Sequence, residues 1–138
     1  MPAGRTVAVP TESSDGLEAP RSEHTGRART FTIVRVGEDG ALGAVRVIPN
    51  PADEASGHGV VATMLVGEAV TDLIVAGIGE GMRTRLVPAG VRIWRDDSSK
   101  TVGDAVRSLA AGVLEPLADA DVHPGHHADS RVPPGRLN

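Results

Sequence analysis

The chain has 138 residues, which is the size of one ordinary domain with its own core. About 40% of the residues are hydrophobic, but Phe31 and Trp94 are the only aromatic ones, so we expect an aliphatic core and no stacking of nucleobases on aromatic platforms. The formal net charge of -4 and the scattered arginines argue against a nucleic-acid partner, and no apolar run approaches the roughly 20 residues of a membrane span.

The chain contains no cysteine. Disulfides, zinc fingers and thiolate-ligated iron-sulfur clusters are therefore excluded as properties of this chain alone. Any metal must be bound through histidine, carboxylate or backbone groups. The first ten residues lack the basic and then apolar layout of a signal peptide, so we expect a cytoplasmic protein. The sequence does not indicate an oligomeric state.

Three strands are predicted in the first half of the chain. The β-branched run Thr6–Val9, closed by Pro10, is typical of a first strand. The apolar runs Phe31–Val36 and Ala41–Ile48 flank the turn segment Gly37-Glu-Asp-Gly40. This pattern predicts an antiparallel hairpin.

After the hairpin, the hydrophobic residues recur with a helical period instead of a period of two. Val60, Val61, Met64 and Leu65 recur at helical spacing, which predicts a helix from Gly57 to about Ala69. The continuous apolar run Asp72–Ala76 then predicts a strand that is covered on both faces.

Two further helices and one strand complete the predicted order. The segment Gly77-Ile-Gly-Glu-Gly81 opens a short helix, with Met82, Leu86 and Val87 on one side, that ends at Pro88–Gly90. A strand follows at Val91–Trp94. Thr101-Val-Gly-Asp104 has the spacing of a capping box, and an apolar stripe continues the last helix to about Ala111.

This order predicts an α/β domain over residues 1–117, with a mixed five-stranded sheet that contains the antiparallel hairpin, and with three helices. From residue 118 onward Asp, His, Pro, Gly and Arg dominate without an apolar period. We therefore expect residues 118–138 to form a disordered tail.

Several short motifs resemble those of one known family. The segment His24-Thr-Gly26-Arg27-Ala28 is similar to the His-x-Gly-Arg-Ala signature of the dinitrogenase iron-molybdenum cofactor biosynthesis family. Further motifs stand in the family's usual order, namely Val7–Pro10, Asn50-Pro51, Gly57-His58-Gly59 and Asp72–Gly79. The resemblance covers residues 5–117. One departure is Thr25, since the family usually places Phe after the signature histidine, and we expect a smaller and more polar pocket wall.

The family includes NifX-like carriers and the C-terminal domain of NifB cofactor-synthesis proteins. The resemblance implies a ribonuclease-H-like three-layer fold that binds an iron-sulfur, iron-molybdenum or other metal-sulfur cluster without covalent attachment. It also implies partners among cofactor-assembly or recipient proteins in nitrogen fixation.

His24 is the leading candidate ligand. It lies in a loop between two predicted strands, where a neutral imidazole can ligate a metal while Gly26 gives access and Arg27 offsets the charge of an anionic cluster. The alternative is a solvated loop histidine, with Arg27 paired to Glu23 on the surface. The resemblance favours the ligand.

Two glycine-rich segments are further candidates. Gly57-His58-Gly59 lies at a predicted helix start, where free N–H groups suit an anion and His58 could be a second metal ligand; a role in helix entry alone is equally compatible. Gly77 and Gly79 follow a buried strand, so bare backbone can approach an anion there, although simple turn chemistry is an equal alternative.

Catalysis finds no specific support in the sequence. The two-metal nuclease mechanism needs several carboxylates, normally one on the first strand, and Thr6–Pro10 contains none. The histidines of His123-x-x-His126-His127 have the residue type of metal ligands but no predicted scaffold, which favours a flexible tail. We therefore expect a non-catalytic carrier or scaffold; the alternative is a regulatory or adaptor module that binds an anionic metabolite or a partner protein.

Overall fold

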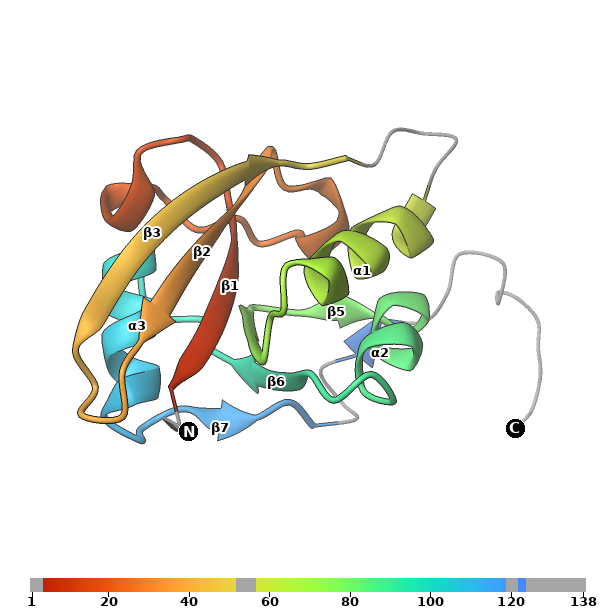
Figure 1. Cartoon of the computed structure of the whole chain (residues 1–138). Helices are drawn as coiled ribbons and strands as arrows, with labels where there is room; N and C mark the ends of the chain where they lie inside the picture. Colours follow the sequence, from red (N-terminus) through yellow and green to blue (C-terminus); the bar gives the residue numbers. More distant parts are fainter. Residues whose placement is uncertain (1–3, 52–56, 119–121, 124–138) are drawn as a thin grey trace.

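A computed structural model of the chain describes residues 4–51, 57–118 and 122–123. The main sheet contains β1 (Arg5–Thr11), β2 (Thr30–Val36), β3 (Leu42–Pro49), β4 (Asp72–Val75), β6 (Arg92–Arg95) and β7 (Glu115–Pro116). Their order across the sheet is β3-β2-β1-β4-β6-β7 (Figure 1). The sheet is mixed, because β1 is antiparallel to β2 and parallel to β4, and β4 is parallel to β6.

The predicted hairpin is confirmed. β2 and β3 pair antiparallel from Thr30 with Pro49 to Val36 with Leu42, with one irregularity near Val34. Gly40 has a φ of 84°, which an L side chain rarely adopts, so glycine is required to close this turn. The first strand is longer than predicted, since β1 continues through Pro10 to Thr11.

Alternating residues of the strands separate two hydrophobic cores. On β1, Ala8 faces the core beneath the first two helices, whereas Val7 and Val9 face the core beneath the third helix. The same alternation places Leu73 on the first face and Ile74 on the second. A period of two on central strands thus builds helix layers on both sides of the sheet.

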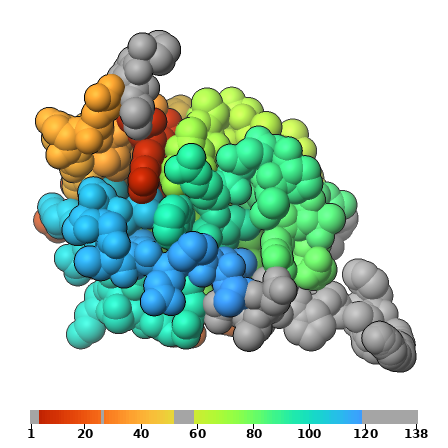
Figure 2. All heavy atoms as spheres, turned by 90° about the horizontal axis from the view of Figure 1, so that it is seen from below, coloured from red at the N-terminus to blue at the C-terminus, as the bar shows by residue number. Residues whose placement is uncertain are grey.

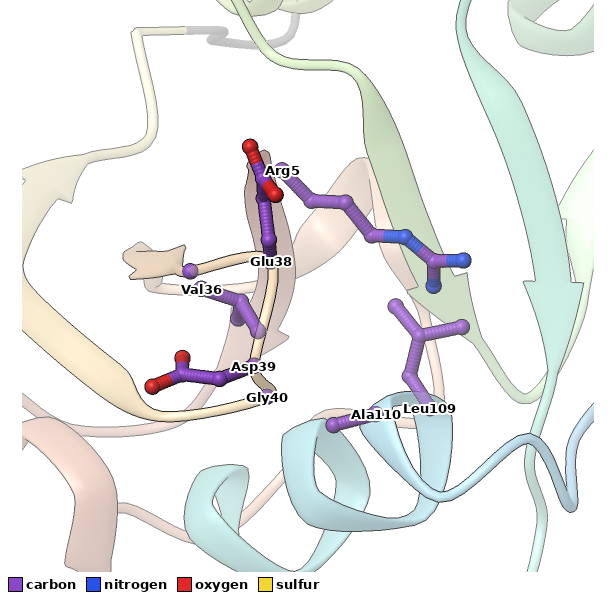
Figure 3. A pocket seen from close by; sticks show the side chains of 8 residues that line it. Arg5, Val36, Glu38, Asp39, Gly40, Leu109 and Ala110 are labelled. Carbon is purple, nitrogen blue, oxygen red and sulfur yellow. The ribbon is translucent and has the colours of Figure 1, made fainter. Parts of the chain in front are cut away.

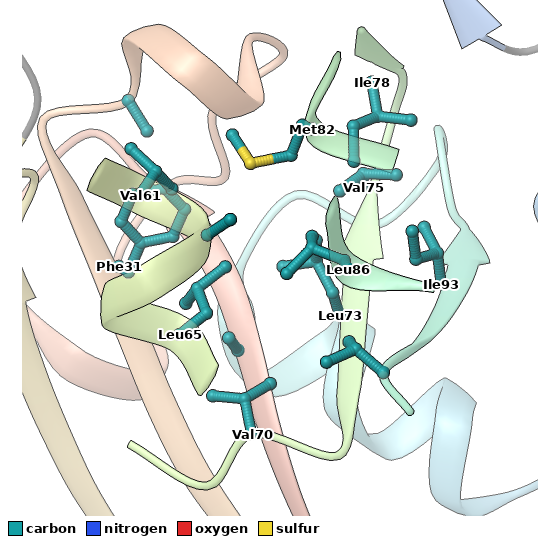
Figure 4. Packing of buried hydrophobic residues seen from close by; sticks show 14 of the residues in the cluster. Phe31, Val61, Leu65, Val70, Leu73, Val75, Ile78, Met82, Leu86 and Ile93 are labelled. Carbon is teal, nitrogen blue, oxygen red and sulfur yellow. The ribbon is translucent and has the colours of Figure 1, made fainter. Parts of the chain in front are cut away.

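The three predicted helices form close to their expected bounds. They are α1 (Gly57–Gly67), α2 (Glu80–Leu86) and α3 (Val102–Ala110). Residues of α1 and α2 pack on Phe31 and its neighbours on one face (Figure 4), and α3 packs on the other. α3 begins as predicted, because Thr101 accepts a hydrogen bond from the Asp104 N–H at 3.2 Å. Val87 follows the end of α2 and is exposed, contrary to expectation.

The sequence missed four short elements and one strand of the main sheet. The expected five strands become six through β7, whose two residues pair antiparallel with the end of β6. In the space-filling view the blue segment that contains β7 lies on the surface (Figure 2). The four short elements are the 3-10 turns η1 (Gly16–Glu18) and η2 (Thr25–Arg27), and a parallel pair, β5 (Ile78–Gly79) with β8 (Val122–His123).

β8 belongs to the segment predicted as a disordered tail. It is an ordered strand, so that prediction is wrong for these two residues; residues 119–121 and 124–138, with His126 and His127, lie outside the described residues. The prediction failed because two residues are too few for a periodic signal. No helix within the described ranges has the length and apolarity needed to cross a bilayer.

Candidate functional site

The three central parallel strands end at one edge of the sheet. β1, β4 and β6 are mutually parallel neighbours, so the loops that follow Thr11, Val75 and Arg95 all leave from that edge. After β1 the chain turns to one side to build β2 and β3, and it returns on the other side at β4 (Figure 1). Ligands of open α/β sheets bind outside the carboxyl ends of the strands at such a reversal.

A cavity of about 650 Å³ lies among these three loops. The residues that line it are Arg21, Ser22, Glu23, His24, Ala76, Gly77, Asp97, Ser98, Ser99 and Lys100. Each of the three loops contributes to this set. His24 and Gly77, which are 53 positions apart in the chain, therefore line one cavity.

The backbone of His24 is held from both sides although its side chain is exposed. The Ser22 hydroxyl accepts from the His24 N–H and donates to the His24 carbonyl, each at 3.2 Å. The Arg27 N–H donates to the same carbonyl at 3.2 Å, which closes η2. Buried Ser22 is in turn anchored to β1, because its N–H donates to the Pro10 carbonyl at 2.8 Å. An accessible imidazole is thus carried on a fixed main chain.

Thr25 ties this loop to the glycine segment. Its hydroxyl donates to the Gly77 carbonyl at 2.8 Å, and both residues are buried. The expectation that Thr25 makes the pocket wall more polar is therefore wrong: the side chain does not line the cavity, and its polar group is used inside the protein. A phenylalanine at this position could not form that bond.

A buried ion pair lies beneath the cavity. The side chains of Arg21 and Asp96 are 7% and 1% exposed, and the Arg21 Nη1 lies 3.6 Å from the Asp96 Oδ1. Burial lowers the pKa of Arg21, against the opposing charges of Asp96 and Asp97. Burial by itself raises the pKa of Asp96, but hydrogen bonds from Ser99 and Ser98 and the charge of Arg21 outweigh it, so this pKa lies below its usual value.

The ion pair joins two of the three loops. Arg21 Nη1 donates to the Ser99 carbonyl at 3.0 Å, and the Arg21 N–H donates to the Lys100 carbonyl at 3.1 Å. Asp96 accepts from the N–H groups of Ser98 and Ser99, both at 3.0 Å. Because these bonds fix both loops, the cavity is formed before any ligand binds.

Two predicted site residues that the structure describes in full, Arg27 and Gly59, are not among the residues that line this cavity. Arg27 is exposed in η2, and Gly26 belongs to the same turn. Gly57 and His58 form the first turn of α1, where the His58 side chain lies outside the described part of the structure. Gly59 lies beside α2, since a Cβ there would stand 3.5 Å from the Arg85 Nε.

Gly79 does not line the cavity; it pairs with His123 in the β5-β8 sheet. The helix that follows it has seven residues and carries Glu80 in its first turn. A carboxylate at that position opposes the attraction of a second anion. Of the two glycines predicted after β4, Gly77 is the one that lines the cavity.

Sequence reasoning missed Arg21, Asp96 and the loop Asp97–Lys100. Charged residues next to serines predict a solvated loop, and burial of Arg21 against Asp96 has no local signal. The segment Asp96-Asp-Ser98-Ser99 does carry the pattern of an Asp side chain that bonds to the next backbone N–H groups. That pattern predicts a turn but not a cavity.

A second cavity, of about 400 Å³, lies near the opposite end of β1. Arg5, Glu38, Asp39 and the end of α3 at Leu109 and Ala110 line it (Figure 3). It is bounded by the β2-β3 turn and contains no residue predicted to bind a ligand. It also lies away from the carboxyl ends of the parallel strands, so the first cavity is the better candidate.

Comparisons with solved structures agree with the observed fold. A protein from Thermotoga described as a candidate NifB protein has a solved structure with a TM-score of 0.66 and 30% identity, covering 82% of this chain and 93% of that one. The apo orange protein of Desulfovibrio gigas has a TM-score of 0.69 at 21% identity, covering 83% and 93%. A candidate dinitrogenase from Methanocaldococcus jannaschii has a TM-score of 0.66 at 20% identity, covering 83% and 96%. The last two comparisons support the fold alone.

The search of curated proteins found no match. The profile of the family described as dinitrogenase iron-molybdenum cofactor matches residues 5–112, which include β1 to α3 and all three loops of the cavity. The match thus spans most of the chain and confirms the resemblance deduced from the His24 segment. The chain belongs to the dinitrogenase iron-molybdenum cofactor family.

Proposed function

We propose that this protein is a non-catalytic carrier or scaffold that holds a metal-sulfur cluster in the cavity beside His24. The observation that carries the proposal is the position of His24 and Gly77 on one cavity at the carboxyl edge of the parallel strands. The family to which the chain belongs is named for the iron-molybdenum cofactor, which supports a cargo of this class. The ribonuclease-H-like class is part of the proposal, and the strand order supports it.

The chemistry of the cavity suits a weakly held anion. The imidazole of His24 supplies one accessible ligand, while Arg21 and Lys100 supply positive charge. The carboxylates of Glu23 and Asp97 oppose that charge, although Asp97 is paired with Arg95 at 2.8 Å. Few ligands and partly balanced charge favour reversible retention, which a carrier needs to release its cargo.

The described residues offer few ligands for a metal ion. Within the described residues no three His, Asp or Glu side chains gather in a way that could hold a metal ion. β1 carries no carboxylate on its seven residues. We therefore propose that proteins of cofactor assembly, or recipients of the cofactor, deliver and remove the cluster while this chain stores it.

Reconstitution under anaerobic conditions tests the proposal. The full chain, incubated with iron and sulfide or with donated cofactor and then desalted, is expected to retain a broad visible absorption band. His24→Ala should weaken the band at least severalfold, because it removes the accessible imidazole from the cavity. The matched control is the double variant His126→Ala/His127→Ala, which removes two imidazoles from the tail.

Each outcome of this experiment is decisive. A band that His24→Ala weakens and the tail variant keeps supports the proposed site. A band that only the tail variant loses contradicts it, because the tail then binds the metal. If no band forms in the wild type while an anionic metabolite raises the melting temperature, the regulatory or adaptor function replaces the carrier.

A further inference from the structure

The guanidinium of Arg21 is buried and incompletely bonded. Its side chain is 7% exposed, yet Arg21 lines the cavity. Nη1 donates to the Ser99 carbonyl and faces Asp96. Nε and Nη2 have no hydrogen-bond partner among the described residues. A buried charged donor without an acceptor costs free energy. The folded chain therefore becomes more stable when an acceptor binds to this side of the guanidinium.

The two unpartnered nitrogens form one edge of the guanidinium. The N–H groups of Nε and Nη2 point in the same direction, and this edge donates two parallel hydrogen bonds to two oxygens of one carboxylate, sulfate or phosphate group. The opposite edge is already held by the protein. Arg21 therefore carries a donor pair in the geometry that recognises an oxyanion.

The nearby carboxylates do not take this edge. Asp96 uses its Oδ1 for the N–H groups of Ser98 and Ser99, and its Oδ2 has no partner among the described residues. Asp97 is exposed and paired with Arg95. Lys100 lines the same cavity and adds a second positive charge, while Glu23 adds a negative one. The specific feature of this cavity is therefore the pair of donors on Arg21 and not its net charge.

We propose that the cavity is an oxyanion site in which a tetrahedral dianion, of the sulfate or phosphate-group class, binds the Nε and Nη2 edge of Arg21. This rests on the same cavity as the proposed function, but it concerns a different ligand. Because both nitrogens are covered, binding requires a small shift of the guanidinium toward the cavity that Arg21 lines. The ammonium group of Lys100, which lines the same cavity, supplies a further donor.

Calorimetric titration of the full chain with sodium sulfate tests this site, with sodium chloride at matched ionic strength as the reference. Sulfate is expected to bind at a single site, and chloride is not. The variant Arg21→Met/Asp96→Asn removes both charges of the buried pair, and the amide oxygen of Asn can still accept from Ser98 and Ser99. It should lose at least tenfold in sulfate affinity, which corresponds to one charge-assisted bond or more.

Two further variants separate the donor geometry from charge. Arg21→Lys keeps the charge but loses the paired donors, so its affinity should fall between those of the wild type and the double variant. Arg92→Gln removes one positive charge from an exposed position on β6 outside the cavity, and it should bind sulfate within about twofold of the wild type. Circular dichroism checks that each variant is folded.

Equal heats for sulfate and chloride, or equal sulfate affinity in the wild type and in Arg21→Met/Asp96→Asn, would overturn the oxyanion site. The carrier function is tested separately. It is contradicted if no absorption band forms in a chain that still binds sulfate. A second titration with adenosine monophosphate identifies the source of the oxyanion. Tighter binding than sulfate assigns a phosphorylated metabolite, and weaker binding assigns a free inorganic ion.

Discussion

Two buried carboxylates at opposite ends of the same strand pair differ in how completely they are bonded. Asp72 begins β4, and it accepts from the Trp94 Nε1 at 2.8 Å and from the Thr71 hydroxyl at 2.6 Å. Asp96 follows β6, where one oxygen is crowded with partners and the other has none among the described residues. A complete network is expected to stabilise the sheet, whereas an incomplete one beside a cavity indicates a place for a ligand.

The largest effect is expected from Asp96→Ala. It leaves the charge of Arg21 buried without its partner and removes the acceptor for Ser98 and Ser99, so we expect a loss of about 3 kcal/mol in the free energy of unfolding. Denaturation in urea measures it. Asp96→Asn keeps the turn acceptor and serves as the control with a smaller loss. Equal losses for the two variants would mean that the hydrogen bonds from Ser98 and Ser99 contribute little and that the lost charge accounts for the whole effect.

Asp72→Ala is expected to cost about 1.5 kcal/mol, because two hydrogen bonds to a carboxylate are lost but no opposite charge is left buried. The same urea experiment gives this value. The variant should retain as much cluster as the wild type after reconstitution, since Asp72 lies at the other end of the strands. Loss of the visible band in a folded Asp72→Ala protein would contradict the separation of the two ends.

Thr25→Val tests the tie between the His24 loop and the glycine segment. The substitution preserves shape but leaves the buried Gly77 carbonyl without the Thr25 hydroxyl, so we expect a loss of about 1 kcal/mol. It should also make the cluster dissociate faster, because the cavity walls are less firmly joined. Thr25→Ser, which retains the hydroxyl, is the control, and faster dissociation in both variants would exclude the hydrogen bond as the cause.

The smallest expected effect is a dependence of the unfolding free energy on pH in the acidic range. The pKa of Asp96 is lowered in the folded protein from 3.8, so its carboxylate stabilises the fold above that value, and this contribution disappears as the pH falls below it. The difference in unfolding free energy between the wild type and Asp96→Asn should therefore shrink from pH 5 to pH 2. A difference that stays constant over this range would contradict the lowered pKa.

The sequence predicted the elements that carry a long periodic signal. The hairpin around Gly40 and the capped helix after Thr101 formed as expected because alternation and capping are local. The shared cavity of His24 and Gly77 was also predictable, since parallel strands end at one edge. In contrast, β7 and β8 have two residues each, and their pairing depends on the tertiary structure.

The buried pair Arg21 and Asp96 could not be predicted for a different reason. Their burial depends on contacts between loops that are 75 positions apart, and each residue by itself is typical of a solvated surface. Arg27, in contrast, was selected as the arginine of the His-x-Gly-Arg-Ala motif, and it lies outside the cavity lining. The same motif thus placed the histidine on the cavity but not the arginine.

The most direct test of the site is a map of amide signals by ¹H–¹⁵N NMR of the wild-type chain before and after loading with cluster. We predict that loss or shift of signals concentrates in residues 21–24, 76–77 and 97–100, which line the cavity, while the signals of Thr71, Asp72 and Arg92 at the other end remain. Changes concentrated around Asp72, or in the cavity between Arg5 and α3, would contradict a cargo site at the carboxyl edge of the sheet.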